Sequence, residues 1–202
     1  MITALTLDDI QNRCKYNYEK SEKRIVAIMI ARYSIKPCRE MIKNQYEFWH
    51  FRTGKSMDFF WLGYGAYAFP GSVGQYLVGD LCGESSVYFD TQVFVEELSK
   101  LSRLADLKFN DSIGIYLCNY HDGNVHFNEG AYLEIESLAK GNHQHDLRDF
   151  ANYIIYECEK DCDIASVVNR FRIKRFKYRI KDIKVSDIIS KTIKCTSKIF
   201  GP

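Results

Sequence analysis

Proline and long hydrophobic runs are scarce in this chain. Its three prolines, Pro37, Pro70 and Pro202, amount to about a third of the usual frequency. No run approaches the roughly 18 to 20 apolar residues that cross a bilayer, so we expect no transmembrane segment. The first residues, MITALTLDDIQNR, also lack the basic stretch and the apolar core of a secretory signal peptide.

The cysteines do not form the pattern of a disulfide framework. They are odd in number and widely scattered: Cys14, Cys38, Cys82, Cys118, Cys158, Cys162 and Cys195. Without a secretory signal, this pattern favours reduced thiols in a cytosol. We therefore expect a cytoplasmic protein.

The remaining composition is that of a folded chain. Hydrophobic residues make up 46% of the sequence and aromatic residues 14%, which is enough for a packed core and argues against disorder. The length of 202 residues suits one domain with an appendage, or two small domains. We predict an N-terminal segment at 1–23, an α/β core at 24–141 and a basic, helical C-terminal extension at 142–202.

Charge is distributed unevenly along the sequence. Residues 170–202, the basic tail, contain eleven Lys and Arg but only two Asp, a formal charge of +9. Because the whole chain carries +2, residues 1–169 carry −7. This division indicates either an anionic partner for the tail or an association of the tail with the acidic body.

The first part of the basic tail has the pattern of an amphipathic helix. Ile173, Phe176, Ile180 and Ile183 recur at steps of three and four, although the same segment also alternates as a strand would. Such a helix can lie on the acidic body, on nucleic acid, in a protein groove or on an anionic membrane. The cationic residues that we expect to act here are Arg170, Arg172, Lys174, Arg175, Lys177, Arg179 and Lys181.

Apolar patterns predict an alternation of strands and helices. Continuous apolar runs predict strands at 25–31, 57–64 and 112–120, and Asp122-Gly123 predicts a hairpin turn that leads into a returning strand. Helical spacing predicts a helix after Pro37 and another from Asp90 or Thr91. Further helices are expected over 129–140, 146–160, 163–182 and 186–199. Residues 63–86 contain six glycines and predict a long loop or short hairpins.

This order of elements resembles the thioredoxin fold. A βαβ unit, a helix, a β-hairpin and a further helix follow one another over residues 24–141, and Ile35-Lys36-Pro37-Cys38 stands where that family carries Cys-x-Pro-Cys. The first family cysteine is Ile35 here, and no proline lies between Pro70 and Pro202 to match the family's cis-proline. The resemblance implies a three-layer, thioredoxin-like but redox-silent core. A flavodoxin-like sandwich begins with the same elements.

Two segments suggest chemistry. Cys38 lies at a predicted helix N-terminus between Lys36 and Arg39, where the helix dipole and the cations favour a thiolate nucleophile. Gly71 and Gly74 belong to a glycine-rich stretch whose backbone amides could approach a phosphate. No P-loop or dinucleotide-binding motif is present, and no Lys or Arg occurs between Lys55 and Lys100.

Aromatic residues are concentrated between positions 46 and 67. Most of them fit a helix and a strand that pack as core, whereas Trp49, Arg52 and Tyr64 are the residues that we expect to be exposed. Exposed aromatic residues beside a cation can bind a base or a peptide. With Gly71 and Gly74, these three residues form the predicted ligand or partner surface.

Histidine and cysteine are numerous enough to raise the question of a metal. The candidates are His121, His126, His143, His145, Cys118, Cys158 and Cys162. None of them has the paired spacing of a standard zinc module, so we predict no metal site and no cofactor.

These patterns favour a binding function over catalysis. We predict a non-catalytic intracellular adaptor or accessory subunit that contacts a protein partner through the aromatic surface and the basic tail. One alternative is a nucleic-acid-binding protein that acts through residues 170–202. A second is an enzyme with a Cys38 nucleophile, or with a phosphate or small-molecule site in the glycine-rich stretch. The sequence does not specify the oligomeric state.

Overall fold

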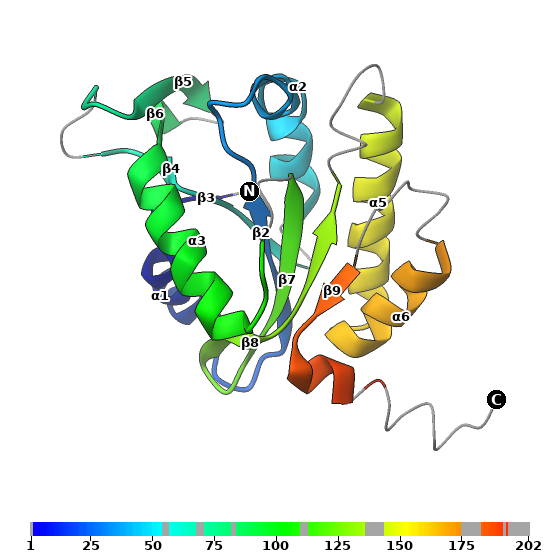
Figure 1. Ribbon diagram of the computed structural model, residues 1–202. Helices are drawn as coiled ribbons and strands as arrows, with labels where there is room; N and C mark the ends of the chain where they lie inside the picture. The colour runs from blue at the N-terminus through cyan, green and yellow to red at the C-terminus, as the bar shows by residue number, and fades with distance from the viewer. Residues whose placement is uncertain are drawn as a thin grey trace.

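The chain forms a mixed α/β structure with two sheets (Figure 1). In this computed structural model the described residues are 2–53, 57–67, 71–81, 84–109, 113–135, 144–174, 183–191 and 193. Among them, no helix combines the length and the apolar character that crossing a membrane requires.

The N-terminal half contains a βαβαβ run followed by short strands. Its elements are β1 (Ile2–Ala4), α1 (Leu7–Asn17), β2 (Arg24–Ile30), α2 (Lys36–Thr53), β3 (Met57–Leu62), β4 (Tyr64–Gly65), β5 (Gln75–Leu81) and β6 (Glu84–Asp90). The strand predicted at 25–31 is confirmed as β2. The strand predicted at 57–64 is confirmed as β3 up to Leu62, whereas Tyr64 begins β4 of the smaller sheet. The helix predicted after Pro37 is confirmed as α2, which begins at Lys36. The short hairpins expected within 63–86 are present as β4, β5 and β6.

The C-terminal half contains one long hairpin, several helices and a last short strand. Its elements are α3 (Thr91–Ala105), β7 (Gly114–His121), β8 (Asn124–Glu134), α5 (Gln144–Lys160), α6 (Ile164–Lys174) and β9 (Ile183–Val185). Residues 187–191 are helical, and the amide of Ser190 donates to the carbonyl oxygen of Ser186 at 2.9 Å. The helix predicted from Ser186 therefore begins where expected.

The central sheet is mixed. Its strand order is β1-β3-β2-β7-β8-β9, whereas the smaller sheet has the order β4-β6-β5. β1, β3 and β2 run parallel, and β2, β7, β8 and β9 pair antiparallel. Ala27 of β2 lies opposite Phe59 on one side and Leu117 on the other, so β2 is an interior strand.

Helices cover both faces of this sheet (Figure 1). α1 and α3 lie on one side, and α2, α5 and α6 lie on the other. Asp90 caps α3 by accepting the amides of Gln92 and Val93 at 2.8 and 3.0 Å, as expected for an acidic N-cap. Because the strands are covered from both sides, all residues of β3 are buried, which explains its unbroken apolar run apart from Asp58.

The helix predicted over 129–140 is wrong for its first part. Residues 129–134 belong to β8, where Ala131, Tyr132 and Leu133 pair with β7 and with β9 and are completely buried. Two neighbouring strands supply backbone partners on both edges of this segment, so non-local pairing overrides the local helical pattern. Residues 136–140 lie outside the described residues.

The helix predicted over 163–182 is confirmed as α6 up to Lys174, and residues 175–182 lie outside the described part. β1 and β9 come from outside the range 24–141, yet both belong to the central sheet. The domain boundaries themselves stay a prediction.

Candidate functional site

The candidate nucleophile Cys38 lies in the first turn of α2 and is completely buried. Desolvation raises the pKa of the buried Tyr64 hydroxyl, and the nearby Cys38 thiol adds to this rise. The predicted position at a helix N-terminus is therefore correct, whereas the thiol is shielded from solvent. A catalytic role for Cys38 stays a prediction.

The expectation that Trp49 and Tyr64 are exposed is wrong. Trp49 is fully buried and stacks on Phe59 of β3, with ring centroids 4.3 Å apart. Tyr64 is buried against Phe89, and its hydroxyl donates to the carbonyl oxygen of Ala31 at 2.7 Å. α2 packs on β3, so these aromatic side chains fill the core and only Arg52 of the predicted trio is exposed.

Gly71 and Gly74 are exposed and adopt positive φ angles of 84° and 90°, which glycine accommodates without strain. The side chain of Gln75 accepts the amides of Gly71 and Ser72 at 3.0 and 3.3 Å. The amides of Gly71 and Ser72 are thus already hydrogen-bonded within the turn that leads into β5.

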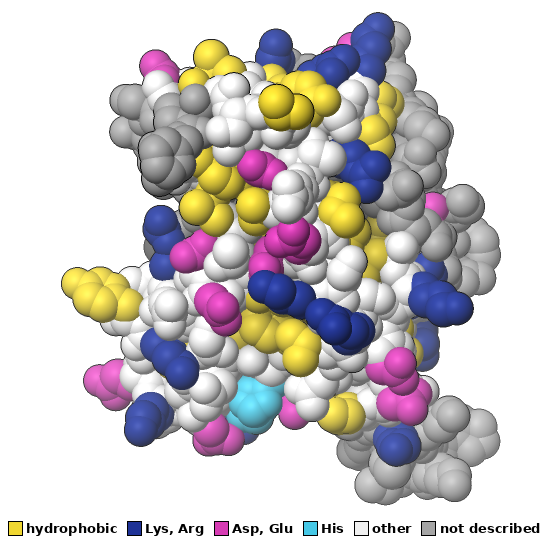
Figure 2. All heavy atoms as spheres, turned by 60° about the vertical axis from the view of Figure 1, so that its left-hand side comes forward, with side chains coloured by type: hydrophobic (Ala, Val, Ile, Leu, Met, Phe, Trp, Pro, Cys, Tyr) yellow, Lys and Arg dark blue, Asp and Glu magenta, His cyan; other side chains and the backbone are white. Residues whose placement is uncertain are grey.

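A second candidate surface spans this turn and the start of β5, because Val73 lies in the turn and Tyr76 and Leu77 lie in the strand. The side chains of Val73, Tyr76 and Leu77 have exposed fractions of 105%, 40% and 58%. Figure 2 shows hydrophobic side chains at the upper end of the face where Figure 1 places β5 and β6. We call Val73, Tyr76 and Leu77 the β5 apolar surface.

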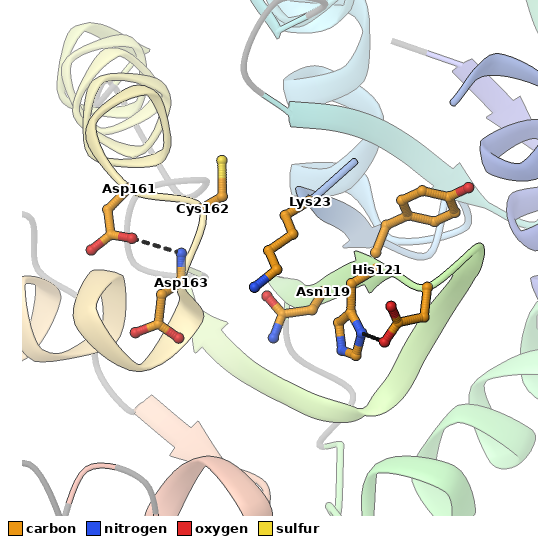
Figure 3. Close-up of a pocket in the computed structure, with 8 residues that line it drawn as sticks. Lys23, Asn119, His121, Asp161, Cys162 and Asp163 are labelled. Atoms are coloured by element: carbon orange, nitrogen blue, oxygen red, sulfur yellow. Dashed lines mark hydrogen bonds and ion pairs between the residues drawn. The ribbon is translucent and has the colours of Figure 1, made fainter. Parts of the chain in front are cut away.

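An open cleft of about 560 Å³ lies between the β7–β8 hairpin and the connection from α5 to α6 (Figure 3). Lys23, Asn119 and His121 line one side, and Asp161, Cys162 and Asp163 line the other. Cys162 is exposed, and Asp161 accepts the amide of Asp163 at 2.9 Å. The cleft therefore presents cations, amides and acids to solvent.

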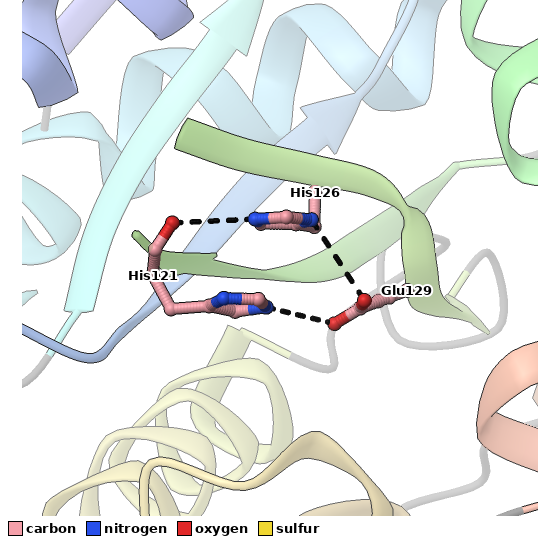
Figure 4. A group of neighbouring side chains, drawn as sticks. All are labelled: His121, His126 and Glu129. Carbon is pink, nitrogen blue, oxygen red and sulfur yellow. Dashed lines mark hydrogen bonds and ion pairs between the residues drawn. The ribbon is translucent and has the colours of Figure 1, made fainter. Parts of the chain in front are cut away.

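The hairpin beside this cleft brings together His121, His126 and Glu129 (Figure 4). Asp122 and Gly123 form the predicted turn, with φ angles of 50° and 76°. A bulge follows, because Cys118 lies opposite Gly130 whereas its neighbour Asn119 lies opposite His126. The extra residues of β8 in this bulge return Glu129 to the two histidines.

The three side chains form one polar cluster. The Nε2 atom of His121 lies 3.1 Å from Oε2 of Glu129, and Nδ1 of His126 lies 3.7 Å from Oε1 of the same carboxylate. The two imidazole rings stack with centroids 3.7 Å apart and an angle of 7°. Their side chains are about one quarter exposed, at 26%, 27% and 23%. Solvent therefore reaches the cluster.

The environment of His121 favours its charged form. Desolvation lowers the pKa of this imidazole, but hydrogen bonds to Asp122 and Glu129 and the charges of both carboxylates raise it more, so the net direction is upward. The same contact with His121 lowers the pKa of Asp122. Asn119 also donates to Oε2 of Glu129 at 3.4 Å.

Sequence reasoning identified His121 and His126 but missed Glu129, because that residue was assigned to a helix. The spacing His121-x₄-His126-x₂-Glu129, read together with the Asp-Gly turn, is the signal that could have found it. Among the other metal candidates, Cys118 and Cys158 are fully buried, Cys162 lies across the cleft, and His143 lies outside the described residues.

The basic tail is partly described. Arg170 forms ion pairs with the buried Glu157 and, at 3.7 Å, with Asp161, while Arg172 is exposed and Lys174 ends α6. This contact is of the kind expected if the tail packs on the acidic body. Arg175, Lys177, Arg179 and Lys181 lie outside the described residues.

No family model, no curated protein and no solved structure matches this chain.

Proposed function

We propose that this protein is a non-catalytic binding or accessory protein, built on a three-layer, thioredoxin-like core. The strand order β1-β3-β2-β7-β8, with a parallel first part and an antiparallel hairpin, supports that core. Ile35 stands in place of the first redox cysteine, and Cys38 is buried. In this proposal the core is a scaffold, and binding takes place at the β5 apolar surface and the basic tail.

The β5 apolar surface is the observation that carries this proposal. Burying an exposed leucine or tyrosine contributes on the order of 2 kcal/mol to an association. Val73, Tyr76 and Leu77 lie within five positions of one another and are left to solvent at one end of the molecule. Such a group of apolar side chains is typical of a protein-binding surface.

The edge of the small sheet indicates how a partner binds. Among the described strands, β5 pairs only with β6, so its other edge has no strand partner there, although the Gln75 amide donates to the carbonyl oxygen of Ser72 at 3.0 Å. The β5–β6 pairing is irregular after Leu77, and the exposed Asp80 lies in this irregular part. Bulges and charged residues at an edge both discourage the addition of another strand. Gln75–Leu77 has neither feature. An extended segment of a protein partner can therefore add as a strand here, with alternate side chains beside Tyr76 on one face of β5 and beside Leu77 on the other.

Site-specific photo-crosslinking tests this function. A photoreactive phenylalanine analogue is placed at Leu77 and, as the matched control, at Tyr16, which is 91% exposed on α1. In cells that make the protein, we expect one discrete adduct from position 77 and none from position 16. Leu77 lies at the edge and Tyr16 on a helix face, so only the former reports strand addition.

A second variant shows whether the adduct depends on the β5 apolar surface. Tyr76→Asp, combined with the photoreactive residue at position 77, is expected to abolish the adduct, whereas Tyr16→Asp leaves it unchanged. Equal labelling from both positions, or an adduct that survives Tyr76→Asp, would refute the proposal. An adduct of twice the chain mass would identify a second copy of this chain as the occupant instead.

The alternative functions have weaker support. Arg170 already pairs with acids of α5 and its C-terminal end, so it is less available to nucleic-acid phosphates. Cys38 has no exposed surface to offer a substrate.

A further inference from the structure

We propose that His121, His126 and Glu129 form a binding site for a divalent transition-metal ion, with Zn²⁺ as the ion that fits best. Two imidazoles and one carboxylate are a ligand set that zinc accepts, with a further position open to water. The inference does not depend on the β5 apolar surface. It rests on the positions of three side chains in the β7–β8 hairpin.

The spacing of the ligand atoms suits a tetrahedral ion. Bonds of about 2.0 to 2.1 Å place neighbouring ligand atoms about 3.4 Å apart in that geometry. Nε2 of His121 lies 3.1 Å from Oε2 of Glu129, and Nδ1 of His126 lies 3.7 Å from the other carboxylate oxygen, Oε1. All three ligand atoms lie within 4.8 Å of one another. Each imidazole therefore faces its own oxygen of the Glu129 carboxylate, and an ion bound between them would draw both nitrogens toward that carboxylate.

The outer nitrogen of each imidazole is held in the way that metal sites require. The carbonyl oxygen of His121 can only accept, so Nε2 of His126 donates to it, at 3.2 Å, and Nδ1 faces Glu129. The carboxylate of Asp122 accepts from Nδ1 of His121 at 2.9 Å, and Nε2, which lies 3.1 Å from Glu129, gives up its proton when it binds the ion. Metal-binding histidines characteristically donate their other N–H to a carboxylate or a backbone carbonyl in this manner.

The carboxylate is oriented as well. Asn119 donates to Oε2 of Glu129, and it is the residue that faces His126 across the hairpin. The three candidate ligands therefore come from a single hairpin, and each has a hydrogen-bond partner of its own. Such support is what distinguishes a built site from a chance meeting of polar side chains.

Metal binding requires one local movement. The imidazole rings are nearly parallel, at 7°, whereas lone pairs that meet at one ion lie in the planes of rings that converge. We therefore expect the rings to turn out of the stack when the ion binds. The side chains are about one quarter exposed, which leaves room for this rotation and for a water ligand. His121 also lines the cleft. The water position of the bound ion would therefore face space for a small anionic or polar ligand.

Titration of the chelator-treated, full-length protein tests the site. Calorimetry with Zn²⁺ is expected to show one ion per chain, and Co²⁺ is expected to give the visible absorption of a tetrahedral site. Glu129→Gln and His126→Gln each remove a ligand. They should lower affinity by more than the roughly 10- to 100-fold that loss of an outer partner costs.

Two kinds of control accompany these variants. Asp161→Asn and Cys162→Ser alter donors across the same cleft and are expected to leave the affinity unchanged. Asp122→Asn keeps a residue that tolerates a positive φ and removes only the carboxylate that positions His121. It should weaken binding by about 10- to 100-fold and shift the His121 tautomer in nitrogen NMR spectra.

Histidine NMR of the unaltered protein keeps the proposal testable if a variant does not fold. Zn²⁺ should shift the ring signals of His121 and His126 at one equivalent, and leave those of His50, His143 and His145 in place. Absence of stoichiometric binding would overturn the proposal. So would affinity that survives Glu129→Gln and His126→Gln, or that is lost with Cys162→Ser.

Discussion

The β7–β8 and β5–β6 hairpins differ in how far the fold buries their side chains. The β7–β8 hairpin lies inside the central sheet, between β2 and β9, and its polar tip ties His121, His126 and Glu129 together. The β5–β6 hairpin lies in the small sheet and leaves Tyr76 and Leu77 in solvent. The polar side chains of one hairpin tip pair with one another, whereas the other hairpin keeps Tyr76 40% and Leu77 58% exposed, which is the basis of the partner surface proposed above.

This contrast separates two kinds of recognition. The polar tip offers few atoms in a fixed geometry, which suits a small cation. The β5 apolar surface offers area and an open edge, which suit an extended protein segment. Burial decides between them, because the same aliphatic side chain stabilises the fold in one hairpin and remains available for binding in the other.

Truncation of one leucine in each hairpin should give the largest difference. Leu117 of β7 is completely buried, so Leu117→Ala is expected to lower the free energy of unfolding by about 2 to 5 kcal/mol through lost transfer energy and a cavity. Leu77→Ala should change it by no more than about 0.5 kcal/mol, because that side chain is 58% exposed. Urea denaturation measures both. Similar values would show that the two hairpins are equally buried.

Removal of a charge beside the polar hairpin should have an intermediate effect. Arg170 of α6 pairs with Glu157 of α5, and α6 contacts both β7 and β8. Arg170→Gln would leave the buried Glu157 carboxylate without its ion-pair partner and should cost about 1 to 3 kcal/mol. Arg172→Gln, an exposed neighbour, is the control and should change stability by less than about 0.5 kcal/mol.

Thermal and urea unfolding of these two variants would also test the position of the tail. Equal stability for Arg170→Gln and Arg172→Gln would show that the Arg170 contact does not hold the start of the tail on the body.

The smallest effect is expected in the pH dependence of stability near the tip of the β7–β8 hairpin. Tyr120 of β7 donates to the carbonyl oxygen of Tyr18 at 3.2 Å, and Tyr18 donates to Asp58 at 2.8 Å. Desolvation raises the pKa of Asp58, although the hydrogen bond from Tyr18 and the charge of Arg24 oppose it. Between the unfolded and folded pKa values the native state binds the extra proton, so ionisation of Asp58 lowers stability as pH rises.

Asp58→Asn removes this ionisation while keeping an oxygen that can accept from Tyr18. The difference in unfolding free energy between the variant and the unaltered protein should shift in favour of the variant as pH rises above about 3.8, the ordinary value for Asp. Denaturation at several pH values measures it. A difference that is constant with pH would contradict the raised pKa of Asp58.

Local patterns predicted most individual elements correctly. The apolar runs of β2 and β3, the Asp90 cap of α3 and the Asp122-Gly123 turn all depend on neighbours within a few residues. Their physical causes are strand burial, capping of free amides and tolerance of positive φ, and these act at short range. Such features can be read without knowing what lies across the sheet.

Long-range packing decided the rest. Trp49 and Tyr64 resemble exposed binding residues in the sequence and are buried. Trp49 of α2 stacks on Phe59 of β3, and Tyr64 of β4 packs against Phe89 of β6. Glu129 follows a helical pattern and is a strand residue, because β7 and β9 provide its segment with hydrogen-bond partners.

The sequence by itself therefore determined where strands, turns and helix starts lie, and how unevenly charge is divided between the body and the tail. Only the tertiary structure decided the order of the strands, which aromatic side chains are covered, and that His121, His126 and Glu129 meet. The physical reason is that burial and strand pairing are set by residues distant in the sequence, whereas propensity is a local property that they override.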